Sequence, residues 1–295
     1  MDINRKYEMK KILFAAFAML ACALASAQTD SERYEQRYDL LVSKLGAAGL
    51  GVETVLDNWE KVDSTNAKML QGRFSYLFTK AQTTEVVSKP GKKYLGMDPL
   101  LTLKDSLGND IYYYQHSVFD DELYGQAIKA ADKAISHHPD RLDFRFMKAN
   151  AYIAYEKESP DMALAYLFSM IDEAGRRSSA WSYGDVEAEP DFFEEAMQEY
   201  CYSFYSIGSE MSREAFRRLS EKLAGIYPSN PEFVNNIGSY YLLKHEYKTA
   251  LKYYNKVLKK HPGDRTAMQN ALIAAKKMKN TKLEKQDQAM MADNG

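Results

Sequence analysis

Apolar residues recur every three or four positions along most of the chain, which is the spacing of amphipathic helices. Three such segments come first, at 34–45, 52–62 and 67–79, and more follow between residues 120 and 279. Glycines separate the first two segments, and the polar stretch 63–66 supplies a turn and a helix N-cap before the third. The pattern predicts a largely helical protein.

Residues 83–118 interrupt this helical pattern. Apolar and polar side chains alternate over 101–104, turn-forming Asp, Asn and Gly residues fill 105–110, and the tyrosine-rich segment 111–114 favours a strand. We therefore predict a loop and a β-hairpin near 100–115. The Asp/Asn cluster lacks the spacing and the terminal Glu of a calcium-binding EF-hand loop, so we interpret it as a simple turn.

A unit of 34 residues covers 231–264. Positions 8, 11, 20, 24 and 32 of this unit hold Gly238, Tyr241, Ala250, Tyr254 and Pro262. The small residues allow two helices to approach closely, the aromatic rings fill the space beside them, and the proline ends the second helix. This unit resembles the tetratricopeptide repeat (TPR), a 34-residue pair of helices.

The same spacing appears upstream. Ala127, Ala134 and Pro139 fit positions 20, 27 and 32 of one unit, and Ala149 and Tyr152 fit positions 8 and 11 of the next, which covers 142–176. A divergent unit at 197–230 has the correct length but places Phe204 and Phe216 where small residues are expected. Residues 265–279 are expected to form a capping helix.

The resemblance implies an all-α fold, a TPR-like α-solenoid of antiparallel helix pairs with a small β-hairpin insertion near 100–115. We expect N-terminal TPR-like helices at 28–82, the insertion at 83–118 and the main array at 119–279. The polar residues 280–295 are expected to form a tail.

Residues 1–27 have the pattern of an export signal. Basic residues precede an apolar run from Ile12 to Ala25, and Ala25-Ser26-Ala27 matches a signal-peptidase site. We expect cleavage after Ala27 and a periplasmic or envelope-associated protein. The alternative is a lipoprotein cut before Cys22, which would attach the protein to a membrane.

Composition and motifs give no support to catalysis. Hydrophobic residues make up 45% and charged residues 27%, which excludes a disordered chain or a polytopic membrane protein. The sequence contains no phosphate-binding loop, dinucleotide fingerprint, zinc motif or nucleophile elbow. We expect no enzyme activity, no cofactor and no metal, and the net charge of −2 with export argues against nucleic acid.

In TPR proteins the first helix of each pair lines a concave groove. The matching positions in the two clearest repeats hold Asp143, Phe146, Asn150, Ile153, Ala154, Glu232, Asn235, Ser239, Leu242 and Leu243. The resemblance implies that Asn150, Asn235 and Ser239 face a partner segment and that Leu242 gives it an apolar contact. The alternative is that these residues pack against the next repeat.

The sequence therefore predicts a non-catalytic scaffold or adaptor of the bacterial cell envelope, which binds a peptide or partner helix of another protein. One alternative is a glycan- or lipid-binding accessory protein with Tyr112, Tyr114, Trp181 and Tyr240 as stacking platforms. A second is an enzyme with an unrecognised site near the hairpin and the 177–191 loop. Self-association is also possible, because residues 231–295 are net basic and the rest of the chain after Ala27 is net acidic.

Overall fold

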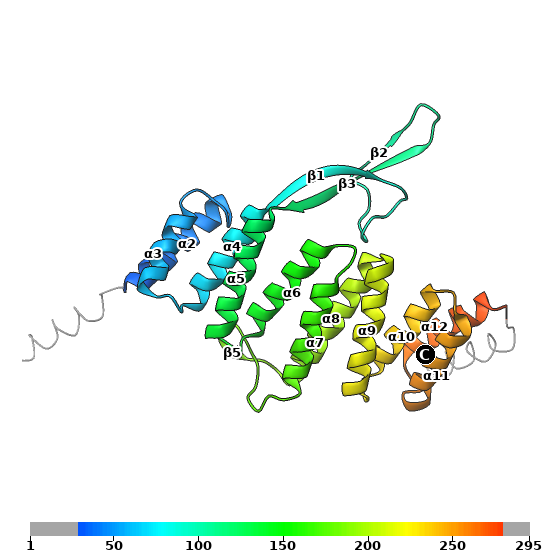
Figure 1. Ribbon diagram of the computed structural model, residues 1–295. Coiled ribbons are helices and arrows are strands. Elements are labelled where there is room, and N and C mark those ends of the chain that lie inside the picture. Colours follow the sequence, from blue (N-terminus) through cyan, green and yellow to red (C-terminus); the bar gives the residue numbers. More distant parts are fainter. Residues whose placement is uncertain (1–28, 280–295) are drawn as a thin grey trace, which may run out of the picture. The chain divides into compact units, whose positions relative to one another are not determined.

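The computed structural model describes residues 29–279 (Figure 1). The expected export signal, Cys22 and the polar tail 280–295 lie outside the described residues. These residues divide into two compact units, one of 29–81 with 121–137 and one of 82–120 with 138–279. No helix in 29–279 is long and apolar enough to cross a membrane.

The first unit consists of four helices. They are α2 (Asp30–Leu45), α3 (Val52–Val62), α4 (Ala67–Ala81) and α5 (Asp121–His137). Helix α2 begins with a capping box, in which Thr29 and Glu32 each accept the other's backbone N–H. Trp59 of α3 is fully buried and its indole N–H donates to Ser31 Oγ at 2.8 Å. These contacts fix the entry of the chain into the helical core.

Helices α4 and α5 pack against each other although residues 82–120 separate them in the sequence. Ala127, Ala131 and Ala134 line up on one side of α5 and are fully buried. These small side chains allow the close helix contact that the repeat spacing implies. The β-insertion therefore lies, in sequence, between the two helices of one pair.

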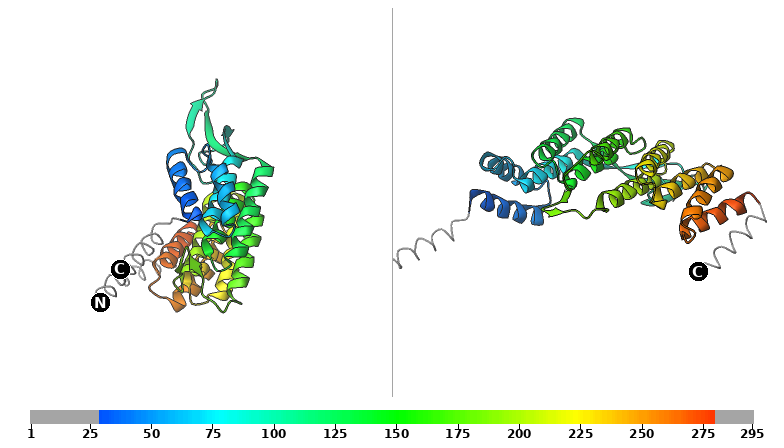
Figure 2. Two further views of the ribbon diagram at one scale, coloured as in Figure 1. Left: turned by 90° about the vertical axis from the view of Figure 1, so that its left-hand side faces the viewer. Right: turned by 90° about the horizontal axis from the view of Figure 1, so that it is seen from below.

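The second unit contains seven further helices (Figures 1 and 2). They are α6 (Leu142–Glu156), α7 (Asp161–Ala174), α8 (Phe192–Ile207), α9 (Glu210–Ile226), α10 (Pro231–Leu243), α11 (Tyr247–Lys260) and α12 (Arg265–Lys277). Consecutive helices pack as antiparallel pairs, and α12 packs against the last pair. This arrangement confirms the all-α, TPR-like solenoid fold.

The α10–α11 pair shows why the repeat requires small and aromatic residues. A Cβ atom at Gly238 would lie 2.6 Å from the ring of Tyr254, so only glycine fits under that ring. Ala250 and Tyr254 are both fully buried. Tyr241 stacks on Tyr253 with ring centroids 5.5 Å apart. The spacing in the sequence thus corresponds to direct contacts between the two helices.

The α8–α9 pair is packed differently. Phe204 and Phe216 take the place of small residues, and both are buried. The ring of Tyr205 meets Phe216 edge-on with centroids 5.4 Å apart. Helix α8 begins at Phe192, so this pair extends beyond the predicted unit 197–230 on its N-terminal side. Aromatic rings fill this interface in place of a close backbone approach.

The insertion is a three-stranded antiparallel sheet with the order β1–β3–β2. The strands are β1 (Gln82–Lys89), β2 (Leu101–Lys104) and β3 (Asp110–Phe119). Strands β2 and β3 form the expected hairpin, with Leu101 opposite Tyr113. Strand β1, which follows α4 directly, was not predicted. In the turn, Asp105 Oδ1 accepts the backbone N–H groups of Leu107 and Asn109 at 2.8 Å each.

The single thiol of the described chain, Cys201 on α8, is fully buried. Burial raises its pKa from the ordinary value of 9.0 for a cysteine thiol to about 12. At pH 8 the thiolate fraction of Cys201 should therefore be about a thousandfold below that of an exposed thiol. We expect iodoacetamide to leave Cys201 unmodified in the folded protein and to alkylate it in 6 M guanidinium, as measured by peptide mass spectrometry. A folded-state rate within tenfold of the unfolded-state rate would show that the site opens readily.

Candidate partner-binding groove

A cavity of about 610 Å³ lies on the first helices of successive pairs in the second unit. Side chains of α6, α8 and α10 line it, together with one residue of the 177–191 segment. The lining residues are Phe146, Asn150, Tyr183, Phe192, Glu195, Ala196, Gln198, Glu199, Tyr200, Ser203 and Glu232. We call this cavity the α6–α8 groove.

Four aromatic rings form one side of the α6–α8 groove. Phe146 is at their centre, with ring centroids 5.9 Å from Tyr200, 6.3 Å from Phe192 and 6.5 Å from Tyr183. The hydroxyl of Tyr200 donates to the carbonyl oxygen of Phe146 at 3.4 Å, and burial raises the pKa of this phenol. The rings therefore pack against one another as one cluster.

Three carboxylates line the same groove, those of Glu195, Glu199 and Glu232. Within residues 29–279, none of them forms an ion pair with a Lys, Arg or His side chain. Burial raises the pKa of Glu232, and the negative charges of Asp264 and the neighbouring glutamates raise it further. The groove is therefore a region of uncompensated negative charge.

An amide pair joins α8 to α10 beside the groove. Asn236 Nδ2 donates to Gln198 Oε1 at 2.7 Å. A smaller hollow of about 160 Å³ adjoins this pair, lined also by Tyr202, Tyr205 and Ser239. Because Gln198 lines both hollows, the lined surface continues along α8 from one to the other.

The segment after α7 contributes Tyr183 to the groove. It forms a short hairpin of β4 (Ser182–Tyr183) and β5 (Val186–Glu187). The backbone N–H of Ser182 donates to Asp140 O at 2.9 Å, and that of Gly184 donates to Asp143 Oδ1 at 3.2 Å. These bonds fix the hairpin beside α6, with Tyr183 at the edge of the groove.

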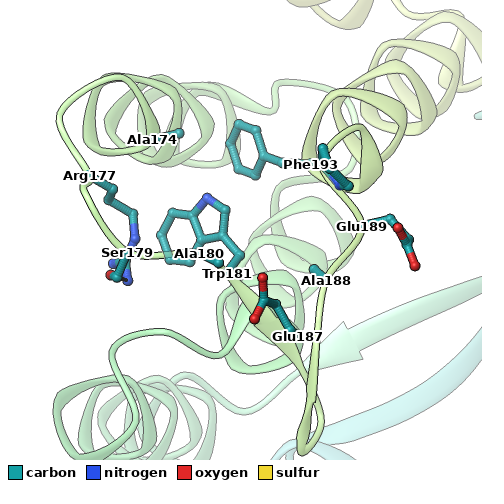
Figure 3. A pocket seen from close by; sticks show the side chains of 10 residues that line it. Ala174, Arg177, Ser179, Ala180, Trp181, Glu187, Ala188, Glu189 and Phe193 are labelled. Carbon is teal, nitrogen blue, oxygen red and sulfur yellow. Dashed lines mark hydrogen bonds between the residues drawn. The ribbon is translucent and has the colours of Figure 1, made fainter.

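Trp181 anchors the same segment and lines a separate cavity of about 590 Å³ (Figure 3). Its ring stacks on Phe193 with centroids 6.0 Å apart. The guanidinium carbon of Arg177 lies 3.8 Å and that of Arg145 5.0 Å from the ring centroid. Both arginines also bond Glu173. This cluster ties the 177–191 segment to α6 and α7.

The structure places the four predicted groove residues in different environments. Asn150 is exposed and lines the α6–α8 groove. Asn235 is buried, and its Nδ2 donates to Asp264 Oδ1 at 3.1 Å. Ser239 lines the smaller hollow and lies within hydrogen-bonding distance of the Tyr254 hydroxyl. Leu242 packs on the core of α10–α12. Asn235 and Leu242 thus pack against neighbouring helices.

Sequence reasoning missed the α8 side of the groove. The repeat positions did include Phe146 and Glu232, which line the cavity, but no residue from 192–203. Groove positions were assigned only in the two clearest repeats, and none was assigned in the divergent unit 197–230, whose first helix α8 begins earlier, at Phe192. The available signal was the polar and small stripe Glu195, Glu199 and Ser203 at helical spacing.

The four stacking residues of the glycan- or lipid-binding alternative are spread over β3, the segment before β4, and α10. Tyr114 is fully buried, with its hydroxyl donating to Gly91 O at 2.6 Å. Tyr112 is on β3, Trp181 precedes β4, and Tyr240 on α10 donates to Glu214 at 3.0 Å. Across residues 29–279, no group of three or more His, Cys, Asp and Glu side chains has a metal-binding arrangement.

No protein-family model matches the chain, and no curated protein matches it in sequence. Among solved structures, it is similar to one described as a functional characterisation of Pseudomonas aeruginosa pilF, with 16% identity, a TM-score of 0.37 and coverage of 59% of this chain and 70% of that one. It is also similar to the crystal structure of MamA, with 14% identity, a TM-score of 0.31 and coverage of 59% and 82%. Both TM-scores are below 0.5, so the fold assignment rests on the helix pairs described above.

Proposed function

We propose that this protein is a non-catalytic interaction scaffold of the bacterial cell envelope, and that it binds a peptide or partner helix of another protein in the α6–α8 groove. The observation that carries this proposal is the groove itself, a cavity of about 610 Å³ that combines aromatic rings with polar side chains. The N-terminal export pattern of residues 1–27 supports the envelope location.

The groove has the properties of a binding surface for a polypeptide. Aromatic rings offer large apolar contact areas at a small cost in side-chain entropy, and they are enriched in the binding centres of protein interfaces. The exposed amide of Asn150 has no hydrogen-bond partner in the described residues, so its donors and acceptor are available to a peptide backbone. The continuation along α8 offers an extended track rather than a small closed pocket.

Site-specific photo-cross-linking tests this function. A benzophenone side chain at Asn150 should cross-link one defined partner protein in cells that produce the full chain. The matched control carries the same group at Asn255, which is exposed on α11 and does not line the groove. We expect the partner band at position 150 and its loss at position 255. Equal bands from both positions, or none from either, would contradict groove binding.

A further inference from the structure

We propose that the α6–α8 groove is selective for a basic partner, and that a Lys or Arg side chain of that partner enters it between the carboxylates and the aromatic rings. This inference rests on the proposed function and adds the chemical class of the partner. The observation that carries it is one cavity that combines three carboxylates without an ion pair and four aromatic rings without a cation over them from residues 29–279.

The carboxylates of the groove differ from three paired glutamates elsewhere in the second unit. Glu173 bonds Arg145 and Arg177, and on α9 both Glu214 and Glu221 pair with Arg217. In contrast, Glu195, Glu199 and Glu232 have no cationic partner within residues 29–279. No lining residue of the groove is Lys or Arg. A bound cation would therefore supply the charge that the protein itself provides at Glu173, Glu214 and Glu221.

The rings of the groove also differ from three rings of the same unit that a cation covers. Arg177 covers Trp181 at 3.8 Å, Lys222 covers Phe168 at 5.0 Å, and Arg217 covers Tyr240 at 5.6 Å. Within the described chain no cation lies over the four groove rings. Those four rings are Phe146, Tyr183, Phe192 and Tyr200. A cation over an aromatic face gains about 0.5–2 kcal/mol according to its exposure.

The two observations favour the same ligand. A carboxylate beside an aromatic face binds an ammonium or guanidinium group by charge and by the ring quadrupole together. An acidic segment would place like charge beside the three glutamates. A purely apolar segment would remove water from them without supplying a counter-ion. Charge complementarity therefore commits the groove to a basic segment of a partner protein.

Selection from a random 12-residue peptide library displayed on phage tests the inference on the full chain. The key variant is the triple change Glu195→Gln, Glu199→Gln and Glu232→Gln, which keeps the shape of the groove and removes its charge. The matched control, Glu122→Gln, Glu210→Gln and Glu246→Gln, removes the same charge from exposed residues that do not line the groove. A groove-blocking variant, Asn150→Trp, identifies peptides that bind at this site. Far-ultraviolet circular dichroism checks that each variant is folded.

We expect the selected peptides to be enriched in Lys or Arg at one position. Their affinity should fall at least tenfold for the groove triple variant and stay within twofold for the control triple variant. Peptides without a basic position, or equal affinities for both triple variants, would overturn this inference while leaving groove binding intact. If no peptide depends on position 150, both proposals fail. Self-association of the full chain that only the groove triple variant abolishes would instead assign the groove to a second copy.

Discussion

Alanine at position 238 is expected to destabilise the α10–α11 pair by about 1–3 kcal/mol, the usual cost of overpacking a core. The new Cβ atom would lie 2.6 Å from the ring of Tyr254, which is itself fully buried. Because the ring cannot withdraw into solvent, the two helices must separate. Urea denaturation gives the loss in unfolding free energy, and hydrogen exchange should show the faster opening of α10 and α11.

The matched control is Gly225→Ala on α9, where an added Cβ meets no atom within 4 Å. Because glycine costs a helix about 0.5–1 kcal/mol relative to alanine, this change should be neutral or stabilising. Gly238→Ala should cost less unfolding free energy in a protein that already carries Tyr254→Leu than in the unaltered protein, because the ring that the new Cβ atom would meet is then absent. Equal changes in unfolding free energy for Gly238→Ala and Gly225→Ala would contradict the close contact between α10 and α11.

Glutamine at position 173 is expected to cost about 1–3 kcal/mol of unfolding free energy, between the values for a surface and a buried ion pair, because Glu173 is 35% exposed. Glu173 accepts two bonds from Arg145, at 2.9 and 2.8 Å, and one from Arg177 at 3.1 Å. The side chain of Arg145 is only 8% exposed, so its charge would remain buried without a counter-ion. Because these arginines also cover Trp181, the 177–191 segment should exchange its amide hydrogens faster.

Asp185→Asn is the matched control for this prediction. Asp185 pairs with Arg141 at 3.0 Å, yet its side chain is 96% exposed, so the pair is a surface one. Surface ion pairs contribute about 0–1 kcal/mol, and we expect a change under about 0.5 kcal/mol. Equal losses for Glu173→Gln and Asp185→Asn would contradict the anchoring role of the Trp181 cluster.

The fold class could be predicted because the repeat pattern is local. Gly238, Ala250 and Tyr254 meet across one helix pair within a short stretch of chain, so their spacing specifies their contact. The β2–β3 hairpin was predictable for the same reason, since the turn chemistry of 105–110 joins two adjacent strands.

Strand β1 was missed because its partner is distant. Gln82 pairs with Phe119, at the opposite end of the insertion, and a strand without a neighbouring turn signal has little to mark it. The pairing of α4 with α5 was missed likewise, because residues 82–120 lie between them in the sequence. Packing, rather than local preference, decides such contacts.

The groove, like the fold, was predictable in part from local sequence and in part only from the tertiary structure. The repeat suggested a groove on the first helix of each pair, and Asn150 and Phe146 both line the cavity described here. The repeat pattern did not show that Asn235 donates its hydrogen bond to Asp264, nor that Glu195 and Glu199 join Glu232. Those facts depend on the start of α8 and on its neighbours.

The sequence by itself determined the helical class, the paired-helix repeat, the hairpin and the export pattern, because each depends on residues that are close along the chain. Only the tertiary structure decided which repeat residues are buried, where Tyr183 and Trp181 lie, and that three glutamates share a groove without a cation from residues 29–279. The physical reason is that burial and the electrostatic field at a side chain are set by neighbours from other helices, which the spacing of residues in one helix does not record.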